Sequence, residues 1–213
     1  MPARLRPTAP IAPDAILVGD PGRALMLAQE LLEQPKMSNH ARGLWGYTGA
    51  AKAGGELTVQ STGMGGPSAS VVLADLAELG LRRAIRIGTC ASLGDLGLGE
   101  LLLVSEARTP GGVAAAPDQD LAAALEGALG NVTRGVAVSL DTLHQPERDR
   151  PTLLAEGADM QTAALLATAA KHDVAAAALL IAFERSDAGQ LRDEELEEAA
   201  KRAGTAASGV LSA

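Results

Sequence analysis

Short apolar runs alternate with longer amphipathic stretches along most of the chain. Runs rich in Ile, Leu, Val and Ala, bounded by Gly or polar residues, predict strands at 15–19, 57–62, 84–88, 100–107, 133–140 and 175–183. Stretches in which alanine and leucine recur at helical spacing predict helices at 24–34, 70–80, 120–129, 162–172 and 193–211. Strands that alternate with helices are typical of an α/β fold, in which a mostly parallel sheet is covered on both faces.

Alanine and leucine must fill the core, because aromatic residues make up only 1% of the chain. With 213 residues and 47% apolar side chains, the chain is long enough for one substantial core, and we expect one domain spanning residues 1–213. The formal net charge of −8 argues against a nucleic-acid partner, which needs clustered positive surface. A small anion can still bind at a local positive pocket.

Cysteine and histidine usage argues against a metal site. Cys90 is the only cysteine, which excludes an intrachain disulfide and a cysteine cluster. His40, His144 and His172 lie on separate segments without the spacing of metal ligands. The N-terminal segment lacks the apolar core of a signal peptide, and no apolar run reaches the roughly 18 residues that a membrane helix needs. We therefore expect a cytoplasmic protein without membrane contact.

Three segments at the ends of expected strands carry residues that suit an anion. The turn GDPGR at 19–23 offers backbone N–H groups and an arginine at a helix start. The turn STGMGGPS at 61–68 opens a second helix, with neither the G-x-G-x-x-G spacing nor a P-loop lysine. The segment RIGT at 86–89 adds a guanidinium fork and a hydroxyl. Each alone is consistent with an ordinary turn or a solvated arginine, but three in one chain favour a phosphate-sized ligand.

Arg86 strengthens this interpretation. It lies near the end of an apolar run and is followed at once by Gly88 and Thr89. A guanidinium is costly to bury without a partner. We therefore expect its missing counter-charge to be an anion that arrives from outside the chain.

The segments GDPGR, STGMGGPSAS and RIGTCASL, in this order and spacing, resemble the nucleoside phosphorylase family, which includes uridine phosphorylase and the hexameric purine nucleoside phosphorylases. The resemblance spans nearly the whole chain and is closer to the uridine branch, where the phosphate-site hydroxyl is a threonine. It implies a single domain of three αβα layers around a central mixed, mostly parallel sheet. It also implies inorganic phosphate as co-substrate, no metal or organic cofactor, and dimers that assemble into a hexamer.

The resemblance assigns the phosphate site to five positions. These are Gly19, Arg23, Arg42, Arg86 and Thr89. Arg42 matches the arginine that the family lends to the neighbouring subunit's phosphate. Without the family, Arg42 is one more surface cation.

The segment GADMQTAALL at 157–166 aligns with the family's Glu-Met-Glu ribose segment, which places Asp159, Met160 and Gln161 at the sugar. Gln161 keeps hydrogen-bonding capacity but lacks the negative charge that stabilises a cationic sugar. Asp159 is one methylene shorter than glutamate. These substitutions leave open a slow enzyme, a differently specific enzyme or a non-catalytic relative.

The base site resembles the uridine-branch segment at SLDTLHQPERD, 139–149. The expected base contacts are Cys90, Ala91, Leu143, His144, Gln145 and Arg148. Leu143 and His144 stand where the family has an aromatic pair, which weakens stacking on the base. Gln145 and Arg148 would hydrogen-bond uracil, and a solvated polar loop is the alternative.

The segment FERSDAGQ at 183–190 offers two candidates for an acid that protonates a purine. Asp187 matches the family's Ser-Asp pair in type, whereas an ungapped count places Glu184 there. Either carboxyl can act as a general acid when burial favours its protonated form. A solvated loop with Arg185 is the alternative.

The resemblance therefore implies phosphorolysis of a ribonucleoside to the free base and ribose 1-phosphate, with Arg86 and either Glu184 or Asp187 as catalytic residues. A uridine-like substrate is the first expectation, and a purine or methylthioadenosine-type nucleoside is the alternative. The rival functions are a nucleosidase of the same fold, a non-catalytic nucleoside or phosphate binder, and a plain structural oligomer.

Overall fold

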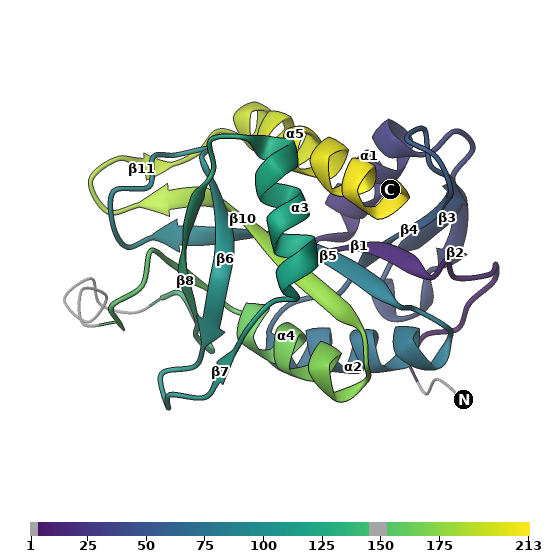
Figure 1. Ribbon diagram of the computed structural model, residues 1–213, viewed down its shortest axis with the longest axis horizontal. Coiled ribbons are helices and arrows are strands. Elements are labelled where there is room, and N and C mark those ends of the chain that lie inside the picture. The colour runs from purple at the N-terminus through teal and green to yellow at the C-terminus, as the bar shows by residue number, and fades with distance from the viewer. Residues whose placement is uncertain (1–3, 145–152) are drawn as a thin grey trace.

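The computed structural model of the protein describes residues 4–144 and 153–213 (Figure 1). Its strands are β1 (Asp14–Val18), β2 (Lys36–Asn39), β3 (Gly46–Ala50), β4 (Glu56–Ser61), β5 (Arg83–Ser92), β6 (Leu101–Arg108), β7 (Ala114–Ala115), β8 (Thr133–Ser139), β9 (Gly157–Asp159), β10 (Ala175–Arg185) and β11 (Gly189–Gln190). Its helices are α1 (Pro21–Leu31), α2 (Gly66–Glu78), α3 (Gln119–Leu129), α4 (Thr162–Lys171) and α5 (Asp193–Ser212), with a short 3-10 turn η1 (Ala41–Gly43).

Parallel pairing forms the centre of the sheet. β4, β1, β5 and β10 lie side by side in this order, and each contact between neighbours is parallel. In the register of β1 and β5, Val18 pairs with Ile87, so the carboxyl ends of both strands reach the same edge. Ligands in α/β folds bind outside this edge. Antiparallel strands extend the sheet on both sides, with β3 against β4 and β6 against β10.

Five strands close into a ring. β10 pairs with both β5 and β6, β6 pairs with β8, β8 pairs with β9, and β9 returns to β5. The sequence did not predict this closure, because the strand at 84–88 was expected to end at Gly88. β5 instead continues to Ser92, and Ala91 and Ser92 pair with β9. Half of the sheet is therefore a small barrel and the other half is open.

Helices cover both faces of the sheet. α2 and α4 pack together on one face, where Val72 and Leu165 belong to one buried apolar cluster. α1, α3 and α5 pack on the other face, where Leu27 and Leu125 belong to a second cluster (Figure 1). The sheet thus separates two cores. Alanine and leucine predominate in both, as the composition predicts.

The expected α/β fold with a central mixed sheet and helices on both faces is confirmed. All six expected strands and five expected helices are present, although their ends shift by a few residues. The strands β2 and β3 and the short strands β7, β9 and β11 were not predicted from the sequence. Across residues 4–144 and 153–213, no helix has the length and apolar character required to cross a membrane.

Candidate active site

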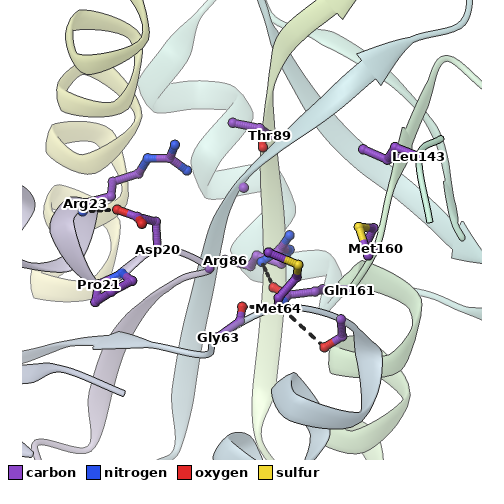
Figure 2. A pocket seen from close by; sticks show the side chains of 13 residues that line it. Asp20, Pro21, Arg23, Gly63, Met64, Arg86, Thr89, Leu143, Met160 and Gln161 are labelled. Atoms are coloured by element: carbon purple, nitrogen blue, oxygen red, sulfur yellow. Dashed lines mark hydrogen bonds between the residues drawn. The ribbon is translucent and has the colours of Figure 1, made fainter. Parts of the chain in front are cut away.

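A pocket of about 410 Å³ opens at the carboxyl edge of the parallel strands. It is lined by Gly19, Asp20, Pro21, Arg23, Gly63, Met64, Gly65, Arg86, Gly88, Thr89, Leu143, Met160 and Gln161. These residues come from the turns after β1 and β4, from β5, and from the segments that follow β8 and β9. The three segments singled out as anion-binding therefore meet at one place (Figure 2).

Arg86 lies in the floor of the pocket and is 4% exposed. Its Nε donates to Thr162 Oγ1 at 3.0 Å, its Nη1 to Gln161 Oε1 at 2.7 Å and its Nη2 to Asp159 Oδ2 at 3.0 Å. A guanidinium has five N–H groups, so two remain for a ligand. Arg86 is thus held rigidly at the pocket.

Asp159 is the buried counter-ion of Arg86. It is 1% exposed, and its carboxylate also accepts hydrogen bonds from Ser139 Oγ at 2.6 Å and from Thr162 N at 3.0 Å. The expectation that Arg86 depends on an outside anion for its counter-charge was therefore wrong. Asp159 does not line the pocket, and its side chain is bound to Arg86.

Gly88 explains how β5 accommodates a buried arginine. Residues 86 and 88 lie on the same face of the strand, and the guanidinium of Arg86 lies over Gly88. A Cβ at Gly88 would lie 2.5 Å from Arg86 Nη2 and 2.8 Å from Cζ. The absence of a side chain is therefore a steric requirement.

Gln161 is saturated with hydrogen bonds. Its Oε1 accepts from Arg86 and from Thr62 Oγ1, the latter at 3.1 Å. Its Nε2 donates to the carbonyl oxygens of Gly63 at 2.6 Å and Gly65 at 3.4 Å. The amide orientation is fixed, because only the oxygen can face the guanidinium. Gln161 lines the pocket, as expected of a sugar-site residue, but it ties the glycine-rich turn to β5.

Arg23 projects toward the pocket from the first turn of α1. Asp20 caps this helix, its carboxylate accepting a hydrogen bond from the backbone N–H of Arg23 at 2.7 Å. Burial lowers the pKa of Arg23; the negative charge of Asp20 opposes this shift, and the positive charge of Arg86 adds to it. Within residues 4–144 and 153–213, the guanidinium of Arg23 has no hydrogen-bond or ion-pair partner. This is the cation that still needs an anion.

Apolar side chains form the opposite wall. Figure 2 shows Leu143 and Met160 on the far side of the pocket from Arg23, with Arg86 and Gln161 between them. Met64 stands at the rim and is 81% exposed. The pocket is therefore cationic at one end and apolar at the other, which matches a ligand with a phosphate and a base.

The other residues expected to contact the base either do not line the pocket or lie outside the described residues. Cys90 and Ala91 are buried in the β5 extension and do not line the pocket. Burial raises the pKa of the Cys90 thiol to about 12, with the charge of Asp159 adding to the shift and that of Arg86 opposing it. His144 is exposed and is not among the lining residues. Gln145 and Arg148 lie outside the described residues.

Glu184 and Asp187 differ in placement. Glu184 is half-buried in β10 and is paired in register with Ala91. Its carboxylate accepts a hydrogen bond from Gln190 Nε2 at 3.5 Å. Asp187 lies in the exposed turn between β10 and β11 and forms an ion pair with Arg185 at 2.6 Å. Neither lines the pocket; Glu184 is half-buried near the carboxyl end of β10, and Asp187 is exposed. This placement favours Glu184 over Asp187 as the acid.

Arg42 lies in η1, is exposed, and does not reach this chain's own pocket. Its backbone adopts the left-handed conformation with a φ of 61°, which is uncommon for a residue other than glycine. In the described part of the chain, no three potential metal-ligating side chains gather into a group.

Three polar residues that bind Arg86, Gln161 and Asp159 were not predicted from the sequence. These are Thr62, Ser139 and Thr162. Each is a small hydroxyl residue at a strand end or helix start, where such residues are common for local reasons. Thr62 follows β4, Ser139 ends β8 and Thr162 begins α4, so only the folded sheet brings them together and no local pattern marks their hydrogen bonds.

Known proteins resemble this chain in sequence and in fold. The Phosphorylase superfamily model matches residues 13–213. The chain is 31% identical over 210 residues to "Purine nucleoside phosphorylase DeoD-type" of Caldanaerobacter subterraneus subsp. tengcongensis, covering 87% of this chain and 88% of the relative. It is 34% identical over 206 residues to the protein of the same name from Alkaliphilus metalliredigens, with the same coverage.

Two solved structures share the fold. Purine nucleoside phosphorylase from Toxoplasma gondii has a TM-score of 0.84 at 20% identity, covering 94% of this chain and 91% of that one. Uridine phosphorylase from Vibrio fischeri ES114 has a TM-score of 0.80 at 22% identity, covering 94% and 92%. With the family match over nearly the whole chain, the chain belongs to the phosphorylase superfamily and is a nucleoside phosphorylase of the pentosyltransferase type.

Proposed function

We propose that the protein catalyses the reversible phosphorolysis of a purine nucleoside to the free base and ribose 1-phosphate. One observation carries this proposal. One pocket joins Arg86, Thr89 and the guanidinium of Arg23, which has no partner among the described residues, to an apolar wall. A phosphate dianion between the guanidinium groups of Arg23 and Arg86 would supply the negative counter-charge for Arg23.

In the proposed reaction, phosphate lies on the cationic side of the pocket and the base lies against Leu143 and Met160. The glycosidic bond stretches, positive charge develops on the sugar, and the adjacent phosphate stabilises that charge before forming the new bond to the anomeric carbon. Catalysis of this kind rests on positioning and on charge complementarity. It requires no cofactor besides phosphate as co-substrate.

The curated relatives favour a purine, since those compared above are named purine nucleoside phosphorylases. Glu184, at the end of β10, is then the proposed general acid for the leaving base. Uridine is the second candidate, supported by Thr89 at the pocket and by the resemblance of 139–149 to the uridine branch.

The assay combines enzyme and phosphate with inosine, adenosine, methylthioadenosine and uridine, and identifies the free bases and ribose 1-phosphate by chromatography. We expect purine release that depends on phosphate, and Glu184→Gln should slow it while Asp187→Asn should not. Release of uracil alone would replace the purine assignment with the uridine one. Base release without phosphate would identify a nucleosidase, and nucleoside binding without ribose 1-phosphate would identify a non-catalytic binder.

Arg42 belongs to the same proposal through an assembly of subunits. Since it is exposed and away from its own pocket, we propose that it reaches the phosphate of a second copy in a dimer, and that dimers form a hexamer. Each phosphate site would then have three arginines. Arg23 and Arg86 would come from one subunit, and Arg42 would come from its neighbour.

A further inference from the structure

Gln161 lies between the cationic and the apolar ends of the pocket (Figure 2). In the proposed reaction the phosphate is on the cationic side and the base lies against Leu143 and Met160, so the sugar lies between them, beside Gln161. The other polar side chains that line the pocket are Asp20, Arg23, Arg86 and Thr89. The first two belong to the turn that starts α1, and the last two to the proposed phosphate site. Among the described residues, Gln161 is therefore the polar side chain placed to meet the sugar.

The hydrogen-bonding groups of Gln161 are all in use. A side-chain amide has two acceptor lone pairs and two donor hydrogens. Its Oε1 accepts from Arg86 Nη1 at 2.7 Å and from Thr62 Oγ1 at 3.1 Å. Its Nε2 donates to the carbonyl oxygens of Gly63 at 2.6 Å and Gly65 at 3.4 Å. The side chain is 4% exposed, so turning it toward a ligand would break these bonds and leave buried polar groups unpaired.

We propose that the protein accepts nucleosides whose sugar lacks the 2′- and 3′-hydroxyl groups about as readily as ribonucleosides. A site rejects an analogue without a hydroxyl when the loss leaves one of the site's own polar groups unpaired. Gln161 keeps its four hydrogen bonds whether the sugar hydroxyls are present or not. The inference rests on the proposed function, because it names the class of sugar that the same pocket takes.

The reaction itself does not require the two hydroxyl groups. An oxygen of phosphate forms a bond to the anomeric carbon as the glycosidic C–N bond breaks. The electron pair of that bond leaves with the base, which takes up a proton, and the second product is 2,3-dideoxyribose 1-phosphate. Both hydroxyl groups withdraw electrons from the anomeric carbon, so their removal makes the cationic sugar easier to form.

A glutamate at position 161 would bind the sugar differently. A carboxylate only accepts hydrogen bonds, so the oxygen that replaces the amide nitrogen cannot bond to the carbonyl oxygens of Gly63 and Gly65. Its lone pairs are then open to the sugar hydroxyls, and hydrogen bonds to a charged group are about twice as strong as those between neutral groups. The family's Glu-Met-Glu ribose segment has this carboxylate at the position of Gln161.

The test compares kcat/KM for inosine, 2′-deoxyinosine and 2′,3′-dideoxyinosine at saturating phosphate, measured by the release of hypoxanthine. For the wild type, the value for dideoxyinosine should be no more than about tenfold below that for inosine. In Gln161→Glu the preference for inosine over dideoxyinosine should rise by about tenfold or more, because the carboxylate gains the two hydroxyls as partners. If the protein releases uracil instead of a purine, the same series of uridine analogues is measured.

Gln29→Glu is the matched control. It makes the same chemical change at an exposed position of α1 and should leave the ratio of the two kcat/KM values as in the wild type. Circular dichroism and melting curves establish that each variant is folded.

The outcomes separate the inference from the proposed function. A wild type that cleaves inosine but prefers it to dideoxyinosine by more than about tenfold would overturn the inference and leave the proposed function standing. A folded Gln161→Glu variant with the wild-type ratio would overturn the role given to Gln161. A wild type that releases no base from any nucleoside would overturn the proposed function as well.

Discussion

At the scale of single residues, the site is built around one guanidinium that the chain itself neutralises. Arg86 and Asp159 form a buried ion pair, and removing one partner of such a pair costs about 3–5 kcal/mol because the other charge is left without compensation. The pair gives Arg86 a fixed place before any ligand arrives. The guanidinium of Arg23 has no partner among the described residues, so it is the group that a phosphate would pair with.

Gly88 is expected to be essential for this arrangement. In Gly88→Ala the new methyl would lie 2.5 Å from Arg86 Nη2 and 2.9 Å from Leu180 Cδ2, so Arg86 must leave its position. We expect the free energy of unfolding to fall by about 1–3 kcal/mol and phosphate binding to be lost. Denaturant unfolding and phosphate calorimetry measure the two effects. Gly94→Ala, where a Cβ meets no atom within 4 Å, is the control and should change neither.

Cys90 should make stability depend on alkaline pH. Burial raises the pKa of its thiol from about 9 to about 12, so the folded protein holds this proton while the unfolded chain releases it. The stabilising contribution is complete below pH 9 and is lost as the pH rises, by about 1.4 kcal/mol per pH unit. Unfolding free energies of the wild type and Cys90→Ala between pH 7 and 10.5 provide the test. Parallel curves for the two proteins would contradict it.

At the scale of elements, the close approach of α5 to α1 depends on glycine. Gly204 faces α1, where a Cβ would lie 2.8 Å from Leu27 Cδ2 and 3.3 Å from Leu31 Cδ1. Gly209 lies in the same helix and is exposed, and a Cβ added there would meet no atom within 4 Å. One glycine therefore serves packing, and the other only lowers the intrinsic helix propensity of α5.

Alanine substitutions should separate these two roles. Gly209→Ala is expected to raise the free energy of unfolding by about 1 kcal/mol, because alanine favours the helix. Gly204→Ala is expected to lower it by about 1 kcal/mol or more, because overpacking against buried Leu27 outweighs the same gain in propensity. Chemical denaturation of both variants measures the difference. If Gly204→Ala also stabilises, α1 and α5 are not tightly packed.

The elements show what the sequence could and could not predict. Strong periodic segments such as β1, β6 and α2 were identified because their apolar patterns are local. β2 and β3 were missed because Lys36–Asn39 and Gly46–Ala50 contain few β-branched or large apolar residues. The extension of β5 through Thr89 was missed because Gly88 looked like a strand end, whereas it is required there by Arg86.

The residues of the site, like the elements of the fold, were predicted only in part. The positions of Gly19, Arg23, Thr89 and Gln161 around one pocket followed from motif order and from the family resemblance. The partner of Arg86 did not, because Asp159 was assigned to the sugar and lies more than seventy residues away in sequence. Contacts across such a distance depend on the ring of strands rather than on any local pattern.

At the scale of the whole molecule, the loop that carries Arg42 is held rigidly and faces outward. The carbonyl oxygen of Leu44 accepts hydrogen bonds from Asn39 Nδ2 at 2.5 Å and from Gln60 Nε2 at 2.9 Å, and both amides are buried. Strained backbone persists only where the surroundings enforce it, and the left-handed Arg42 lies inside this loop. An arginine exposed in this way is suited to binding phosphate in the pocket of a second subunit, as proposed above.

Complementation between two inactive subunits tests the dimer proposed above. If Arg42 acts on the neighbouring site, a subunit with Arg42→Ala still has its own Arg86, and a subunit with Arg86→Ala still lends its Arg42. In a mixed dimer one of the two sites is then complete, so random pairing of co-expressed variants should restore about a quarter of the wild-type activity. Co-expression of Arg86→Ala with Arg23→Ala is the matched control, because both defects lie in the subunit that holds the pocket and each mixed dimer has two incomplete sites. Activity that stays at the level of the single variants in the first pairing would show that Arg42 does not act across an interface, since a shared site is the only arrangement in which two defective chains repair each other.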